Sequence, residues 1–195
     1  MKFLRIAIAT AALGATAAPV AAQYVSSSDE FVTAVRDRDG NKATGLIQSN
    51  PRLIDMRDEK GDTALIVAVS RSDEDYTAFL LSHGADPNVA AKNGDTPLMA
   101  AVRDGFEQGV EWLLGKGAKV DATNRMGETA LIIAVQRRQL PLVKLLLSAG
   151  ADPDKTDSAA GLSARDYATR DNRSRDIQRA IEAKKPRTAA APAIR

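Results

Sequence analysis

The chain has 195 residues, of which 44% are hydrophobic but only 4% aromatic, and it carries 27 Lys and Arg against 25 Asp and Glu. This length suits one compact domain or one short repeat array, and the Ala- and Leu-rich apolar content favours close-packed helices over a β-sandwich. The chain has no cysteine and one histidine, His83, so disulfides, thiolate nucleophiles, cysteine-containing zinc sites and multi-histidine metal sites are excluded.

The first 22 residues have the pattern of a secretory signal peptide. Lys2 and Arg5 form a short positive start, residues 6–18 are an uncharged Ala-rich run, and small residues precede a cleavage point after Ala22. The apolar run is too short to cross a bilayer comfortably. We therefore expect a bacterial periplasmic protein, with secretion beyond the envelope as the alternative and no stable membrane insertion after cleavage.

Cleavage would change the charge balance of the protein. It removes two of the 27 basic residues and no acidic one, which leaves 25 basic against 25 acidic residues. A neutral chain lacks the excess positive charge that a nonspecific nucleic-acid binder needs, so we expect no nucleic acid among the partners.

Two short sequence motifs then recur along the chain. The first opens with Gly-Asp-Thr or a close variant at Gly61, Gly94, Gly127 and Gly161, and these starts are 33, 33 and 34 residues apart. The second, a Leu-Leu motif that runs into Gly-Ala, follows the first in three of the units. Two motifs in register at a fixed period indicate a repeat array.

The motifs resemble those of the ankyrin-repeat family. Gly-Asp-Thr-Pro-Leu at 94–98 matches the family's opening motif, and Gly-Ala-Asp-Pro at 150–153 matches its turn. The resemblance covers about residues 28–184 and implies an all-α solenoid of stacked helix-turn-helix units with hairpin-like loops. It predicts an N-terminal capping repeat at 28–60, full repeats at 61–93, 94–126 and 127–160, a C-terminal capping repeat at 161–184, and a disordered basic tail at 185–195.

The residue types agree with this fold independently of the family. Thr63, Thr96 and Thr129 stand where a hydroxyl can cap the first helix of each unit. The glycine of the second motif, such as Gly84, is expected to end the second helix in the left-handed conformation. Gly109 falls inside a predicted second helix, where glycine is unfavourable. Close packing against Trp112 or against a neighbouring repeat would account for it.

No catalytic, cofactor-binding or metal-binding motif is present, so the protein is expected not to be an enzyme. His83 is expected to meet free carbonyls at a helix end, and Trp112 to pack in the core. Asp86, Asp121 and Asp152 recur once per repeat, which favours local turn bonding over a calcium site. An enzyme that uses scattered carboxylates and a self-assembling array are the alternatives to a protein-binding module.

The resemblance implies that a partner protein binds on the loop tips and the exposed side of the first helices. The tips carry cations, acidic residues follow them, and arginines stand at the helix ends. This pattern predicts a groove lined by alternating bands of positive and negative charge. We also expect the protein to be a monomer. The alternative is that these are ordinary solvated charges. The candidate contact residues are Lys60, Asp62, Arg71, Lys92, Asn93, Asp95, Arg103, Arg125, Met126, Glu128 and Arg137.

The sequence departs from the family pattern at one position of the opening motif. The family usually has a histidine there that ties neighbouring loops together, whereas this chain has Ile66, Met99 and Ile132. We therefore expect looser bonding between the loops and more hydrophobic packing beneath them.

Overall fold

The structure is a computed structural model that describes residues 20–184. Residues 1–19 of the predicted signal peptide and the predicted tail at 185–195 lie outside the described residues, so both remain predictions. No helix within residues 20–184 is long and apolar enough to cross a bilayer.

The described chain forms five helix pairs and no β-strand. A 3₁₀ helix, η1 (Pro51–Asp55), follows the first pair. The pairs are α1 (Val20–Arg36) with α2 (Gly40–Ser49), α3 (Ala64–Val69) with α4 (Glu74–Ser82), α5 (Pro97–Asp104) with α6 (Glu107–Gly115), α7 (Ala130–Gln136) with α8 (Leu140–Ser148), and α9 (Ala164–Arg170) with α10 (Arg175–Glu182). The predicted all-α solenoid is confirmed.

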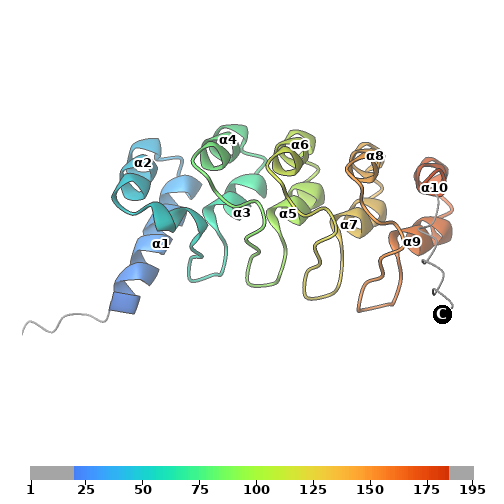
Figure 1. Ribbon diagram of the computed structural model, residues 1–195, viewed down its shortest axis with the longest axis horizontal. Coiled ribbons are helices and arrows are strands. Elements are labelled where there is room, and N and C mark those ends of the chain that lie inside the picture. The colour runs from blue at the N-terminus through green and yellow to red at the C-terminus, as the bar shows by residue number, and fades with distance from the viewer. Residues whose placement is uncertain (1–19, 185–195) are drawn as a thin grey trace, which may run out of the picture.

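The helices lie in two rows (Figure 1). The first helix of each pair lies beside the first helix of the next, the second helices form the other row, and the connecting loops project as a line of hairpins from the first row. One continuous apolar core runs through the stack. Leu65, Leu98 and Leu131 occupy the same buried position in successive units, as the repeat requires.

The predicted helix caps are confirmed. The hydroxyl oxygens of Thr63, Thr96 and Thr129 each accept the backbone N–H three residues on, at 3.2–3.3 Å. Ser163 caps α9 in the same way and forms a reciprocal capping box with Asp166. Gly84 has the expected left-handed backbone, with φ of 90°. These caps set where each helix starts and ends, and therefore which faces meet in the stack.

The loops are tied together at their tips by backbone hydrogen bonds. The N–H of Lys92 donates to the carbonyl of Gly61 at 2.8 Å, and that of Ser158 donates to the carbonyl of Met126 at 2.8 Å. A longer bond of 3.4 Å joins the Arg125 N–H to the Asn93 carbonyl. The expected loosening is therefore not seen between successive tips.

The packing beneath the loops is hydrophobic, as predicted from the missing histidines. Ile66, Met99 and Ile132 stand at that position and are all buried. The tips can approach one another because each has a glycine: a Cβ on Gly127 would lie 2.5 Å from the Ser158 backbone nitrogen.

Gly109 packs against the ring of Phe106, which precedes the same helix, rather than against Trp112 or a neighbouring repeat as suggested from the sequence. A Cβ at position 109 would lie 2.2 Å from the Phe106 ring. Phe106 is buried and meets Trp112 edge-on, with ring centroids 6.1 Å apart. The glycine therefore makes room for an aromatic pair at the start of α6.

We expect Gly109→Ala to destabilise the protein although Ala is the better helix former. Overpacking of a filled core costs about 1–3 kcal/mol, against a gain of roughly 1 kcal/mol in helix propensity. In a Phe106→Leu background the same substitution should become stabilising. Urea unfolding of the four proteins tests this, and a Gly109→Ala effect of the same sign in both backgrounds would contradict it.

Two arginines, Arg38 and Arg138, occupy the turn between the first and second helices in the left-handed conformation. Their φ angles are 60° and 58°, and Gly105 takes the equivalent position in α5's unit. Each arginine reaches an aspartate of the next unit: Arg38 lies 2.9 Å from Asp73, and Arg138 lies 2.6 Å from Asp171. These ion pairs join the units at the two ends of the array.

The Arg138–Asp171 pair should make stability depend on acid. The hydrogen bond from Arg138, aided by the Arg173 backbone N–H, lowers the pKa of Asp171 from 3.8 to about 2. A lowered carboxyl pKa contributes stability that is complete above the unfolded-state value and is lost as pH falls through the folded-state value.

We expect the free energy of unfolding of Arg138→Gly to fall less than that of the wild type as the pH is lowered from about 5 to about 2. The substitution removes the pair, and it also relieves left-handed strain of about 1 kcal/mol. Unfolding free energies measured by urea across this pH range give the comparison. Parallel declines of the two proteins would show that the pair contributes nothing.

Candidate protein-binding face

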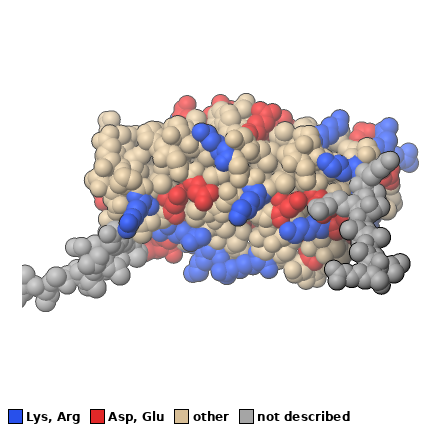
Figure 2. Space-filling view, viewed as in Figure 1, with Lys and Arg blue, Asp and Glu red and all other residues tan. Residues whose placement is uncertain are grey.

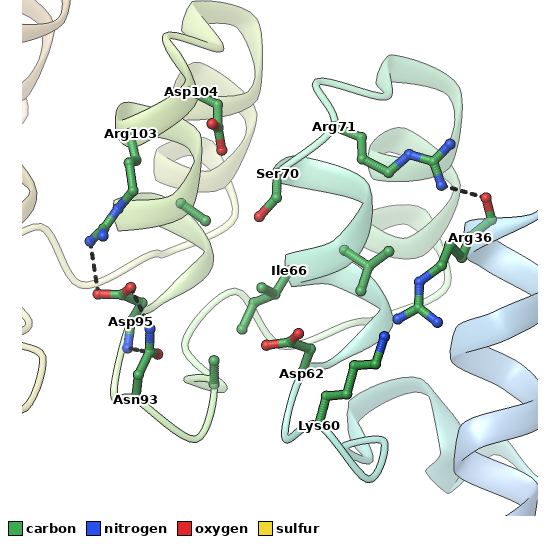
Figure 3. Close-up of a pocket in the computed structure, with 13 residues that line it drawn as sticks. Arg36, Lys60, Asp62, Ile66, Ser70, Arg71, Asn93, Asp95, Arg103 and Asp104 are labelled. Atoms are coloured by element: carbon green, nitrogen blue, oxygen red, sulfur yellow. Dashed lines mark hydrogen bonds and ion pairs between the residues drawn. The ribbon is translucent and has the colours of Figure 1, made fainter.

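A groove of about 380 Å³ lies over α3 and α5, between the end of α1 and the loop tips (Figure 3). It brings together six of the predicted contact residues from three successive repeat units. These are Lys60, Asp62, Arg71, Asn93, Asp95 and Arg103.

The floor of the groove is apolar. Ile66 and Val67 of α3 and Ala100 of α5 line it, and all three are largely buried. Ile66 stands where the family usually has its histidine, so this departure from the family pattern places a hydrophobic side chain under the groove. The groove therefore combines a small apolar floor with charged walls.

The wall nearest α1 is built from two arginines and a lysine. Arg36 forms an ion pair of 3.2 Å with the buried carboxylate of Asp58. A guanidinium N–H of Arg71 donates to the backbone carbonyl of Arg36, which holds Arg71 across the end of α1 (Figure 3). Lys60 is exposed at the loop tip and bears no ion pair within residues 20–184. The charge of Arg36 is thus paired, and Arg71 and Lys60 supply the positive charge of this wall.

Asp62 is the acidic residue next to this wall. It is half-buried, and burial raises the pKa of its carboxyl above the ordinary value; Asp58 adds to the rise, while Arg36 and Lys60 oppose it. Its carboxylate faces the groove (Figure 3). Of the predicted acidic residues it is the one best placed to meet a partner.

Asp95 was predicted to contact the partner, but its carboxylate is turned into a buried polar network. It accepts from Asn93 at 2.7 Å, from Arg103 at 3.1 Å and from Asn124 at 2.9 Å. Asn124 also donates to Glu128 at 2.9 Å, so the network crosses two repeats. Asp95 therefore positions Arg103 and has little capacity left for contacts of its own.

Asp95 holds Arg103, but not every N–H group of the Arg103 guanidinium has an acceptor within residues 20–184. Only one of its terminal nitrogens bonds to Asp95, and its Nε is buried without an acceptor in residues 20–184. The Arg103 side chain is 35% exposed in the lining of the groove, so its other terminal nitrogen can donate to a carbonyl or carboxylate of a partner. Arg103 is the best-prepared contact residue of the face.

The remaining predicted residues lie outside the groove. Lys92 and Arg125 are exposed at loop tips, where they pack over the tip glycines of the preceding loops. Met126, at 51% exposure, is the one large exposed hydrophobic residue of the described chain. Glu128 is held by Asn124, and Arg137 is exposed at the end of α7.

The predicted line of arginines along the helix ends is not regular. Arg71 and Arg137 lie ten residues after their tip glycines, whereas Arg103 lies nine residues after Gly94 and is the only one inside its helix. Patches of basic and acidic side chains do alternate along the molecule, and basic side chains gather at the loop edge (Figure 2). The charged candidate residues therefore do not follow single repeat positions.

Sequence reasoning missed the side chains that hold the loop tips. Asp58, Asn124 and Asp157 occupy one loop position, three or four residues before the tip glycine, and their side-chain oxygens accept backbone N–H groups of the tip. In the remaining loop Asn93 takes over this role by accepting the N–H of Asp95. An acidic or amide residue recurring near each tip was the available signal, but Ala91 interrupts it.

The local roles predicted for His83, Asp86 and Asp152 are confirmed, whereas Asp121 bonds to the backbone of the next repeat instead of its own turn. A ring nitrogen of His83 lies 2.8 Å from the Phe79 carbonyl at the end of α4. The carboxylates of Asp86 and Asp152 accept backbone N–H groups two residues on, and that of Asp121 accepts the Asp152 N–H. Among residues 20–184, no group of three or more potential metal ligands is close enough to hold an ion.

Comparison with known families agrees with the geometry. The family model described as ankyrin repeats, in three copies, matches residues 31–124 and again residues 89–157. The matches together span more than half of the chain, which therefore belongs to the ankyrin-repeat family. Proteins of this family typically act as non-enzymatic scaffolds for protein–protein interaction. Comparison with curated proteins gives no significant match.

We expect Asn124→Ala to destabilise the array by about 1–3 kcal/mol, because it removes the acceptor of two tip N–H groups and one donor to the buried Asp95 carboxylate. The loop tips on both sides should also exchange their amide hydrogens faster. Urea unfolding and hydrogen exchange measure the two effects. The control is Asn41→Ala on exposed α2, and an equal effect of both substitutions would argue against the network.

Proposed function

We propose that this chain is an exported protein–protein interaction module that holds a segment of a partner protein in the groove over α3 and α5. The observation that carries the proposal is the state of Arg103. Its position is fixed by the buried Asp95 network through one terminal nitrogen, yet its side chain lines the groove and remains 35% exposed. A preorganised donor of this kind binds with little loss of side-chain entropy.

The charge pattern supports a partner segment of mixed charge. Arg36, Lys60 and Arg71 line one wall, while Asp62 stands between that wall and the floor. Alternating charges in an interface set the orientation of a partner and reject wrong partners more than they raise affinity. The apolar floor beside Ile66 would take a small hydrophobic side chain between the charged contacts.

The proposed location is the bacterial periplasm, which rests on the signal-peptide pattern of residues 1–22. A binding module there would protect, inhibit or scaffold an exported enzyme. Secretion beyond the envelope is the alternative location. Recovery of the mature protein with Gln23 as its first residue, from the periplasmic fraction, is the result expected from export and cleavage after Ala22.

We expect the variant Arg71→Glu/Arg103→Gln to lose capture of proteins that the mature wild-type chain retains from the exported fraction. Gln is chosen at position 103 because a glutamate would stand against the buried Asp95 and threaten folding. Affinity capture followed by quantitative mass spectrometry measures the loss.

The matched control is Lys116→Glu/Lys119→Glu, which changes the net charge by a similar amount at exposed positions outside the groove. It should retain the same proteins as the wild type. Melting temperatures of all three proteins establish that they are folded. Equal capture by the groove variant and the wild type would refute the assignment of this face.

A further inference from the structure

A second groove of about 350 Å³ lies where α7 and α9 end, near the C-terminal end of the array. Three arginines line it, Arg138, Arg170 and Arg173, and we call them the arginine cluster. Val135 and Tyr167 provide its apolar surface, and Asp171 is the one acidic residue in its lining. Three cations against one anion make this groove electropositive.

The carboxylate of Asp171 is already fully used by the protein. One oxygen accepts from the Arg138 Nε at 2.6 Å and from the Ser174 hydroxyl at 3.0 Å, and the other accepts the Arg173 backbone N–H at 3.1 Å. The pair with Arg138 neutralises one cation of the cluster. Asp171 therefore has little capacity left for the other two arginines.

Arg170 and Arg173 remain available. Arg170 is exposed and forms no ion pair with any residue from 20 to 184. The side chain of Arg173 is 80% exposed, and its Nε lies 3.9 Å from Asp171, the longest ion-pair distance in the described chain. Two guanidinium groups thus border the groove without a close protein acceptor.

The second groove continues the face described above. Arg170 lies nine residues after Gly161, the same interval that separates Arg103 from Gly94. The helices α5, α7 and α9 lie side by side in one row (Figure 1). Neighbouring helices pack about 10 Å apart, so roughly six residues of extended chain at about 3.3 Å each would join the two grooves.

We propose that the arginine cluster is a subsite for acidic side chains of the partner segment, about six residues along from the part that contacts Arg103. This inference rests on the proposed function and adds to it the chemistry of the partner segment and the spacing of its contacts. The planar fork of Arg matches a carboxylate in a bidentate geometry. A protein segment fits better than a membrane, because the arginines border a hollow that also holds Val135 and Tyr167.

The test uses a fluorescent oligoglutamate peptide as the probe and the matching oligoglutamine peptide as its neutral counterpart. Fluorescence anisotropy of the mature protein should show binding of oligoglutamate, weakened by salt, and little binding of oligoglutamine. Arg170→Glu/Arg173→Glu should weaken oligoglutamate binding by about tenfold or more. Lys116→Glu/Lys119→Glu makes the same change in net charge elsewhere and should leave binding unchanged.

Equal binding of both peptides, or equal loss in the two variants, would overturn the subsite. Sedimentation with phosphatidylglycerol vesicles is the second arm, and vesicle binding that depends on Arg170 and Arg173 would assign the cluster to a membrane and overturn it as well. These results are separable from the proposed function. Capture that depends on Arg71 and Arg103 could persist after the subsite had failed.

Discussion

The structure depends on the packing of each helix pair against the next. A single pair has no way to cover its apolar face, because α3, α5 and α7 are only six to eight residues long and are buried along most of their length. Stacking covers that face and at the same time fixes the spacing of the loops. The stacking that buries Leu98 therefore also fixes the positions of Lys60, Arg103 and Arg170 relative to one another on the proposed binding face.

Much of this fold could be predicted because its determinants are local. The threonine caps, the glycine helix ends and the buried leucines each act within one repeat, so a fixed period reveals them. Gly109 could not be explained in this way, because its reason is the rotamer of Phe106. Arg36 was missed for a related reason: the first unit lacks the Gly-Asp-Thr opening, so its helix end could not be aligned with the others.

The candidate site was predicted less completely, because charge in the sequence does not show which way a side chain turns. Asp62 and Asp95 follow their tip glycines at the same position, yet only Asp95 meets an asparagine of the next loop. Asn124 donates to that carboxylate, which also accepts a hydrogen bond from Arg103 and so holds it in place. Neighbouring repeats thus use one sequence position for different purposes, which a pattern read from single repeats does not distinguish.

The backbone bonds between successive tips link the loops into one continuous ribbon along the edge of the molecule. Each of the two middle tips uses one backbone group toward the loop before it and another toward the loop after it. An extra residue in a middle tip would therefore disturb two neighbours at once, whereas an insertion between α2 and η1 would meet no such restriction. Related chains should accordingly have few insertions or deletions in these loop tips. New binding properties would then arise there by substitution of residues.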